Sequence, residues 1–267
     1  MNTIKIWCSL RFWIAILAVV WMAGCTSVGG SGQAELLTSS DLTVAQRRAS
    51  IRLQLAVGYY EQKQMSTALD EIKQALVIYP EYSDAYTVRG MIYMAMGEMP
   101  LAEDNFKRAM SLAPHNPELS NNYGWFLCQN GQEAKSIPYF EVAIKSHTYQ
   151  SPAKALNNAG VCSLKLKDGK AAEQYFTRAF KFDPSSPETN INFAKMYYER
   201  KEYDRAYFYV SRVTKPESMS ADFLWLAIKL GRKRGDREAE STHVAQLRRK
   251  FPNSVEYATY QRGAFDE

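Results

Sequence analysis

The sequence repeats itself every 34 residues from residue 49 onward, and this period is the strongest constraint on its fold. Ala75 and Pro80 recur one period later as Ala109 and Pro114. A fixed period of this length indicates stacked structural units, each of which buries its apolar face against its neighbours. The chain is therefore expected to form an elongated array, not a compact domain.

The period and its marks resemble those of the tetratricopeptide (TPR) repeat, a pair of helices. Small residues such as Gly90 let the two helices approach, large ones such as Phe106 fill the space between them, and proline ends the second helix. The expected fold is all-α: an α-solenoid of six TPR helix pairs forming a right-handed superhelix. The repeats are expected near residues 49–82, 83–116, 117–152, 153–186, 187–220 and 221–254. The third has two extra residues around Tyr149 to Pro152, and the sixth is the most degenerate.

The N-terminus has the anatomy of a secretory signal, with Lys5 and Arg11 followed by an apolar run over residues 12–23. That run is shorter than the ~20 residues that a membrane-spanning helix needs. Residues 22–25, Met-Ala-Gly-Cys, resemble the bacterial lipobox, in which the cysteine is lipidated and becomes the N-terminus. We therefore expect a lipoprotein signal peptide over residues 1–24 and lipidation at Cys25; the alternative is an ordinary signal that contains a cysteine.

Acyl chains on Cys25 would form a firm anchor, since each buried CH₂ contributes about 0.8 kcal/mol. Thr26 follows in place of the aspartate that retains many lipoproteins in the inner membrane. By that resemblance the protein is expected at the outer membrane of a Gram-negative bacterium, lipid-anchored and facing the periplasm. Residues 25–46 are expected to be the lipidated N-terminus and a flexible tether, residues 47–254 the solenoid, and residues 255–267 a C-terminal tail.

Two of the four cysteines remain once Cys8 leaves with the signal and Cys25 is lipidated. Cys128 and Cys162 fall toward the ends of the first helices of repeats three and four. In an oxidising periplasm such a pair can form a disulfide, which would join the two repeats. A disulfide is favoured over free thiols.

The first helix of each TPR pair lines the inner face, where its fifth, ninth and twelfth positions share one side. Apolar residues there suggest a docking groove; Met91 and Met94 suit an adaptable contact, and Trp125 an anchor. The alternative is that these side chains pack against each other or against residues 26–46. The groove candidates are Leu53, Val57, Tyr60, Thr87, Met91, Met94, Asn121, Trp125, Asn157 and Val161. In the last repeat the corresponding residues are Trp225, Lys229 and Arg232. We interpret the basic residues there as a solvated face; the alternative is that they contact lipid or protein. These residues are Lys229, Arg232, Lys233, Arg234 and Arg237.

Catalytic chemistry is not expected. His115, His147 and His243 lie far apart, and the metalloprotease, C-x-x-C, Walker and dinucleotide patterns are absent from the sequence. The net charge is +5, and basic and acidic residues are mixed along the chain with no dominant basic block. We expect no enzyme activity, no metal, no cofactor, no small-molecule substrate and no nucleic-acid partner.

Residues 121–128 (NNYGWFLC) and 155–162 (ALNNAGVC) carry a more specific resemblance, to the type IV pilus biogenesis lipoproteins of the PilF/PilW kind, called pilotins. The resemblance covers essentially the whole chain, and that family's cysteine pair matches Cys128 and Cys162. It implies an outer-membrane lipoprotein that binds the pilus secretin and promotes its localisation and multimerisation, hence pilus biogenesis. The alternative is a TPR scaffold of another envelope machine, such as the β-barrel assembly complex, or a cell-wall enzyme adaptor. The bound face, the secretin segment and the stoichiometry are left open.

Overall fold

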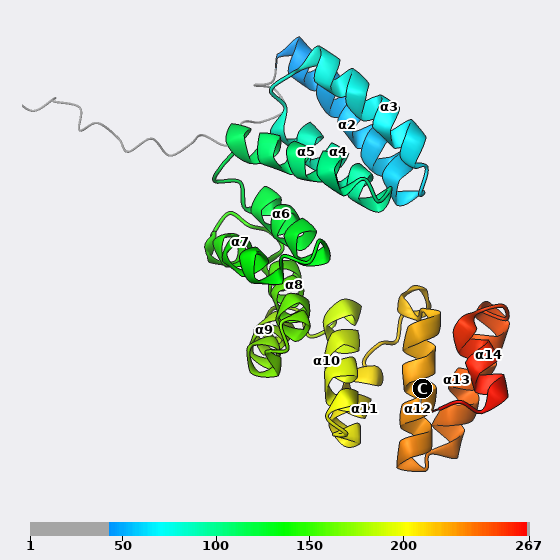
Figure 1. The fold of residues 1–267 in the computed structure, drawn as a ribbon. Helices are drawn as coiled ribbons and strands as arrows, with labels where there is room; N and C mark the ends of the chain where they lie inside the picture. Colours follow the sequence, from blue (N-terminus) through cyan, green and yellow to red (C-terminus); the bar gives the residue numbers. More distant parts are fainter. Residues whose placement is uncertain (1–42, 266–267) are drawn as a thin grey trace, which may run out of the picture. The chain divides into compact units, whose positions relative to one another are not determined.

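The computed structural model describes residues 43–265, and all regular structure within that range is helical (Figure 1). The predicted signal peptide, Cys25 and most of the predicted tether lie outside the described residues. The chain divides into two units at residue 47, and the second unit, residues 48–267, contains the repeats. The first described helix, α2, already begins at Val44, inside the segment expected to be a tether.

Twelve of the helices form six consecutive pairs, which confirms the predicted TPR solenoid. Each pair is an inner helix followed by an outer helix, and each outer helix is followed by the inner helix of the next pair (Figure 1). The pairs are α2 (Val44–Glu61) with α3 (Met65–Ile78), α4 (Ser83–Ala95) with α5 (Met99–Leu112), α6 (Pro117–Gln129) with α7 (Glu133–Lys145), α8 (Pro152–Lys165) with α9 (Gly169–Phe182), α10 (Pro187–Glu199) with α11 (Tyr203–Val210), and α12 (Ala221–Arg234) with α13 (Arg237–Lys250).

Local sequence explains where these helices begin. Pro117, Pro152 and Pro187 occupy the first turn of inner helices, where a missing N–H costs nothing. The side chains of Asn116 and Ser186 accept hydrogen bonds from backbone N–H groups of the helices that follow them. The inner helices of repeats three and five are thus fixed at their starts by side chains from the preceding turn.

The turn between the two helices of a pair requires a left-handed backbone at the same place in every repeat. Gly97, Gly131 and Gly235 have φ between 72° and 82° there, in the second, third and sixth repeats. Lysine takes this conformation in the other three repeats, at Lys63, Lys167 and Lys201. A side chain in the left-handed region costs roughly 1–2 kcal/mol, so the packing of the two helices imposes this turn against local preference.

Two irregularities interrupt the array. The loop over residues 146–151, between α7 and α8, contains the two predicted extra residues, and its buried Tyr149 packs with Ala143 and Ala155. Helix α11 has only eight residues, whereas the other outer helices have 13 or 14. Pro216 stands at the last position of an outer helix of 14 residues that starts at Tyr203, and α11 already ends at Val210. A short 3₁₀ turn, η1 (Pro216–Ser218), follows.

The predicted C-terminal tail includes a helix, α14 (Val255–Arg262), that begins one repeat period after α12. Ser254 caps it through the N–H of Tyr257, as Ser220 caps α12 through the N–H of Phe223. Helix α14 packs on α12 and so takes the place of the first helix of a seventh repeat. The apolar face of the last complete repeat explains this helix, since that face would otherwise contact water.

Candidate partner-binding site

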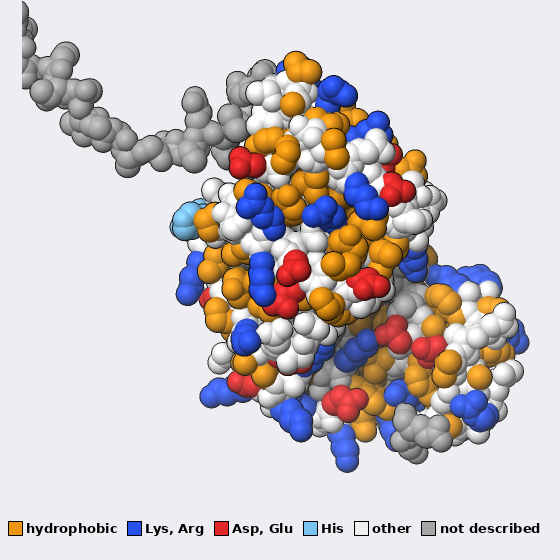
Figure 2. Space-filling view, turned by 45° about the horizontal axis from the view of Figure 1, so that its top comes forward, with side chains coloured by type: hydrophobic (Ala, Val, Ile, Leu, Met, Phe, Trp, Pro, Cys, Tyr) orange, Lys and Arg blue, Asp and Glu red, His pale blue; other side chains and the backbone are white. Residues whose placement is uncertain are grey.

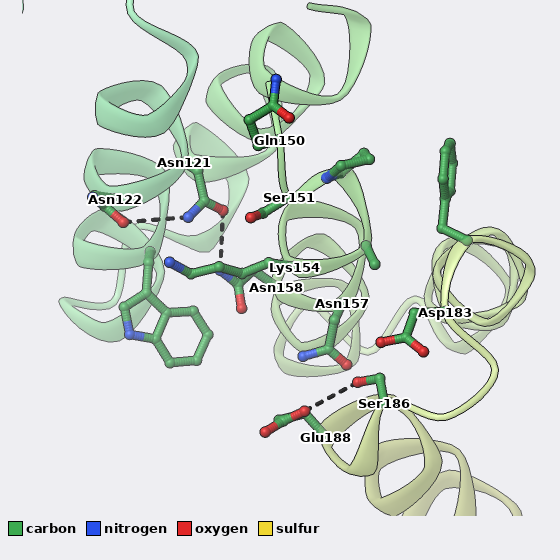
Figure 3. A pocket seen from close by; sticks show the side chains of 14 residues that line it. Asn121, Asn122, Gln150, Ser151, Lys154, Asn157, Asn158, Asp183, Ser186 and Glu188 are labelled. Carbon is green, nitrogen blue, oxygen red and sulfur yellow. Dashed lines mark hydrogen bonds between the residues drawn. The ribbon is translucent and has the colours of Figure 1, made fainter. Parts of the chain in front are cut away.

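A cavity of about 800 Å³ opens on the inner side of repeats three to five (Figure 3). Helices α6 and α8 supply most of its wall, and the turn before α10 closes one end. Of the ten predicted groove residues, Asn121, Trp125 and Asn157 line it. The volume lies within the ~300–1,000 Å³ range typical of ligand sites, and the open form suits a chain segment better than an enclosed small molecule.

Asparagines form a ladder across the inner helices, and each rung joins two consecutive repeats. Asn121, Asn122, Asn157 and Asn158 of this ladder line the wall. Asn158 Nδ2 donates to Asn121 Oδ1 at 3.0 Å, and Asn192 Nδ2 donates to Asn157 Oδ1 at 3.0 Å. In both rungs the donor is the sixth residue of an inner-helix repeat unit and the acceptor is the fifth residue of the unit before it. Asn121, which is fully buried, also donates to Asn122 Oδ1 at 3.3 Å. Figure 3 shows Asn121, Asn122 and Asn158 joined in this way.

Helices α6 and α8 are tied together at both ends. Lys154 pairs with Glu118 at 3.2 Å near their starts, and Lys165 Nζ donates to the Cys128 carbonyl oxygen at 3.3 Å near their ends. Between these ties the structure joins Cys128 and Cys162 by a disulfide, with the Cα atoms 5.9 Å apart. This Cα separation lies within the usual range for a disulfide. An ion pair, a disulfide and a hydrogen bond thus hold together the two helices that form the wall of the cavity.

Trp125 lies half-buried beside this disulfide. It packs against a cluster that contains Cys128, Cys162 and Phe140, and it also lines the cavity. One side of Trp125 is held by this packing, and the rest of its ring is exposed to the cavity. Such a side chain suits an aromatic anchor, because an immobilised side chain loses little entropy when a partner covers it.

The charges of the cavity are divided between its two ends. Lys154 lies on the α8 side, and the carboxylates of Asp183 and Glu188 lie around the turn before α10 (Figure 3). Asp183 accepts hydrogen bonds from the backbone N–H and hydroxyl of Ser185, while Glu188 accepts one from the Ser186 hydroxyl at 3.0 Å. These bonds hold the two carboxylates in place. Because the donors are neutral serine groups, this end of the cavity keeps a net negative charge.

Tyr149 anchors the loop that borders the cavity through Gln150 and Ser151. Burial, and then the nearby carboxylate of Glu118, raise the pKa of its hydroxyl above the ordinary value of 10.0. The hydroxyl of Tyr149 therefore stays neutral, which lets the ring remain buried under the loop, because burial disfavours the charged form. The two extra residues of repeat three thus help to shape the site.

The other predicted groove residues do not line this cavity. Leu53 and Tyr60 pack against the core of the first repeat, and Met91 and Met94 against the core around Phe106. Val57 is half-buried, Val161 packs against the core of the later repeats, and Thr87 is buried with its hydroxyl donating to the Ser83 carbonyl oxygen. The large exposed apolar side chains of the first repeat are instead Ile51, Leu55 and Val77. Apart from the buried Thr87, the early groove residues are half-buried, as Trp125 is.

The C-terminal segment covers the inner face of the last repeat. Phe265 stacks on Trp225 with ring centroids 5.3 Å apart, and the Arg232 guanidinium carbon lies 3.9 Å from the centre of the Phe265 ring. Lys229 lies between the Tyr198 and Trp225 rings, 5.0 and 5.6 Å from their centres. The interpretation of Lys229 as part of a solvated face was therefore wrong. Its two partners are Tyr198 of the preceding repeat and Trp225 one turn earlier on α12, and the sequence analysis considered only the charge of Lys229. Arg234 also packs on a ring, with its guanidinium carbon 3.8 Å from the centre of the Tyr207 ring, and pairs with Asp204 at 3.1 Å. Lys233 and Arg237 are exposed.

Charged side chains of both signs are mixed with apolar ones on the face shown in Figure 2. Within residues 43–265, no group of three or more His, Cys, Asp or Glu side chains is placed to hold a metal ion. His243 is half-buried, and burial lowers the pKa of its imidazole, whose Nδ1 lies 2.7 Å from the Ala239 carbonyl oxygen. In the same part of the chain, no helix is both long and apolar enough to cross a membrane.

Known proteins resemble this chain at the levels of repeat, sequence and fold. Residues 83–116 and 129–187 match the tetratricopeptide repeat family. The type IV pilus assembly protein PilF of Pseudomonas aeruginosa is 25% identical over 95% of this chain and 98% of its own length. The crystal structure of PilW, a widely conserved type IV pilus biogenesis factor, is 32% identical, with a TM-score of 0.70 over 80% of this chain and 98% of its own. This chain belongs to the PilF/PilW family.

Membership in the PilF/PilW family makes this a TPR protein of type IV pilus biogenesis and confirms the resemblance noted in the sequence. A solved structure of P. aeruginosa PilF, 24% identical, has the same fold, with a TM-score of 0.70 over 83% of this chain and 100% of its own. Both relatives are matched over nearly their full length, so the agreement extends well beyond the helix pair that any TPR protein contains. The family's TPR scaffold points to a protein without catalytic activity.

Proposed function

We propose that this protein is a pilotin: an outer-membrane lipoprotein that binds the type IV pilus secretin and promotes its localisation and multimerisation. The observation that carries the proposal is its full-length relationship to two pilus biogenesis proteins. A cavity with an aromatic anchor and fixed polar groups, on the inner side of the solenoid, supplies a place for a protein partner.

The lipid and the solenoid have separate tasks in this proposal. Acyl chains at Cys25 hold the protein, and any secretin subunit bound to it, at the outer membrane. The repeats hold the subunit and cover its apolar surface until enough subunits are present to form the ring. The disulfide between Cys128 and Cys162 is proposed to form in the periplasm and to keep the wall of the cavity rigid.

Deletion of the gene tests the proposal. We expect loss of secretin multimers from the outer membrane and loss of surface pili, with both restored by the wild-type gene. Cys25→Ala should give a folded protein that still captures secretin but carries it to the wrong membrane fraction. Normal secretin multimers and normal piliation in the deletion strain would reject a pilotin function.

A further inference from the structure

The outer side of the solenoid has a cation at one fixed repeat position in four consecutive repeats. This position falls in the last turn of the outer helix, or in the loop that replaces it in the fifth repeat. The four side chains are exposed, and we call them the cationic stripe: Lys145, Lys181, Lys215 and Arg249.

The stripe continues past the shortened helix α11. Val213 is buried, as are Ala143 and Ala179 at the equivalent position of repeats three and four. The backbone therefore keeps the register of the repeat beyond the end of α11. Lys215, two residues after Val213, thus occupies the place that α9 gives to Lys181.

Neighbouring carboxylates do not neutralise the stripe. Among the described residues, no ion pair joins Lys181, Lys215 or Arg249 to an acidic side chain, and Lys145 pairs with Glu141 at 3.6 Å. An exposed pair at this distance contributes little and leaves the ammonium group in water.

The acidic residues near the stripe leave a positive excess. Asp183 follows α9 but accepts hydrogen bonds from Ser185, and Asp222 pairs with Lys195 of the inner helix α10 at 2.7 Å. In the fifth repeat Glu217 is exposed close to Lys215, and the exposed Arg212 adds a second cation there.

Stabilisation of helix ends does not account for the stripe. A cation in the last turn of a helix interacts favourably with the helix dipole. The outer helices α3 and α5 nevertheless have no basic residue in their last turn, and Val77 and Ser111 occupy the stripe position there. Lys215 lies outside any helix. The stripe is thus a feature of repeats three to six and not of the fold in general.

Exposed apolar side chains accompany the cations. Val142 is 49% exposed one turn before Lys145, and Phe208 is 49% exposed one turn before Arg212, whose guanidinium carbon lies 5.3 Å from the centre of the Phe208 ring. Cations mixed with exposed apolar side chains are typical of surfaces that lie in the headgroup region of a membrane. Each Lys or Arg near an anionic leaflet raises the affinity about fivefold.

We propose that the cationic stripe rests on a leaflet that contains anionic phospholipid and thereby fixes the orientation of the solenoid on the membrane. The stripe belongs to the outer helices, whereas α6 and α8 supply most of the cavity wall, so membrane and protein partner can be bound at once. The lipid at Cys25 holds the protein near the leaflet, and the stripe determines which side faces it. The identification of the membrane as the outer membrane rests on the proposed function, whereas the affinity for anionic lipid does not.

The test compares two double variants in repeats four and five. Lys181→Gln with Lys215→Gln removes two cations of the stripe. The control, Lys167→Gln with Lys201→Gln, removes two exposed lysines from the turns that precede α9 and α11, at the opposite ends of these helices. The two variants therefore have the same net charge.

All proteins consist of residues 25–267 with Cys25→Ala, so that no acyl chain contributes to binding. Binding is measured by co-sedimentation with vesicles of phosphatidylcholine, either alone or mixed with phosphatidylglycerol. We expect the parent protein and the control to bind the vesicles that contain phosphatidylglycerol in preference to the neutral ones, with an affinity that falls as the salt concentration rises.

The stripe variant should bind the anionic vesicles about 25-fold more weakly than the parent protein, at about fivefold for each lysine removed. Its melting temperature should match that of the control, because all four lysines are exposed. Equal affinity of the stripe variant and the control, or equal binding of the parent protein to both lipid mixtures, would overturn the inference.

Capture of full-length secretin by the same proteins separates the membrane from an acidic protein partner. Loss of secretin capture in the stripe variant, with vesicle binding unchanged, would assign the stripe to the secretin and reject the membrane. Vesicle binding through the stripe, together with normal secretin multimers in the deletion strain, would support the stripe and reject the pilotin function.

Discussion

Gly160 of α8 lies so close to the ring of Phe176 of α9 that a Cβ atom at residue 160 would overlap three ring carbons. The same relationship recurs in the two preceding repeats, where Cβ atoms at Gly90 and Gly124 would lie 3.1 and 3.0 Å from the nearest atoms of Phe106 and Phe140. In the first and fifth repeats the equivalent pairs are Ala56 with Ile72 and Ala194 with Val210. A larger residue on one helix thus accompanies a smaller one on the other.

This size matching predicts strong coupling between residues 160 and 176. Gly160→Ala should lower the free energy of unfolding by about 1–3 kcal/mol, because the methyl group overpacks the helix interface. In a Phe176→Val background the same change should cost much less, since that pair copies Ala194 and Val210. Urea denaturation of the two single variants and the double variant measures the coupling.

Gly58 is the matched control, because a Cβ atom there meets nothing within 4 Å. Gly58→Ala should stabilise α2 by about 0.5–1 kcal/mol through helix propensity alone. Simple additivity of the changes at residues 160 and 176 would contradict the size-matching explanation.

The repeat array was predictable because its marker residues recur at a fixed spacing along the chain, so each repeat gives the same evidence again. The six pairs and the inserted loop around Tyr149 follow directly from the period. Helix α14 was missed, although Tyr257 and Tyr260 stand one period after the buried Phe223 and Leu226. No outer helix follows α14 among the described residues, so the paired pattern is incomplete there.

The candidate site was predicted in part. Taking the fifth and ninth positions of the inner helices found Asn121, Trp125 and Asn157, but the sixth position was not considered, so Asn122 and Asn158 were missed. Their recurrence at one repeat position was the available signal. Met91 and Met94 are half-buried but lie outside the cavity, because periodicity assigns a residue to a face and does not determine where that face is hollowed.

The disulfide between Cys128 and Cys162 should contribute substantially to stability. It closes a loop of 34 residues, and loops of this order correspond to about 2–4 kcal/mol. Cys128→Ala together with Cys162→Ala, or reduction of the wild type, should lower the melting temperature to the same extent. Mass spectrometry of protein from the periplasm, alkylated before and after reduction, checks the bond itself; two freely alkylated thiols in the native protein would reject it.

Phe265 should shield Trp225 from water. Trp225 is 9% exposed and stacks on Phe265, so Phe265→Ala should increase iodide quenching of its fluorescence and lower the melting temperature. The measurement needs a Trp125→Phe background without residues 1–24, so that Trp225 is the only tryptophan present. Phe182→Ala, at a side chain that is 63% exposed, is the control. Identical quenching in both variants would show that the C-terminal segment does not cover the last repeat.

Glu173 should make stability depend on pH in the acid range. It accepts hydrogen bonds from Arg200 at 2.6 Å and from the Tyr197 hydroxyl at 2.8 Å, and these bonds, the first more strongly, lower its pKa below the ordinary 4.5. Because the folded pKa is the lower one, the stabilisation is complete above pH 4.5 and is lost as the pH falls through the folded pKa. Glu173→Gln should therefore flatten the decline of melting temperature in acid.

Exposed Glu81 supplies the comparison for this experiment. Glu81→Gln should keep the wild-type decline in melting temperature between neutral pH and the acid range. An equally steep decline in the Glu173→Gln protein would contradict the role of this hydrogen-bonded carboxylate between α9 and α10.

Site-specific photo-crosslinking in living cells shows whether the inner face of repeats three to five holds the secretin. A photoreactive amino acid replaces either Lys154, which lines the cavity, or Thr177, which is exposed on the outer helix α9. We predict a secretin adduct from position 154 and none from position 177. A secretin adduct from position 177 alone, or no secretin adduct from either position, would show that the secretin does not bind the inner face of repeats three to five.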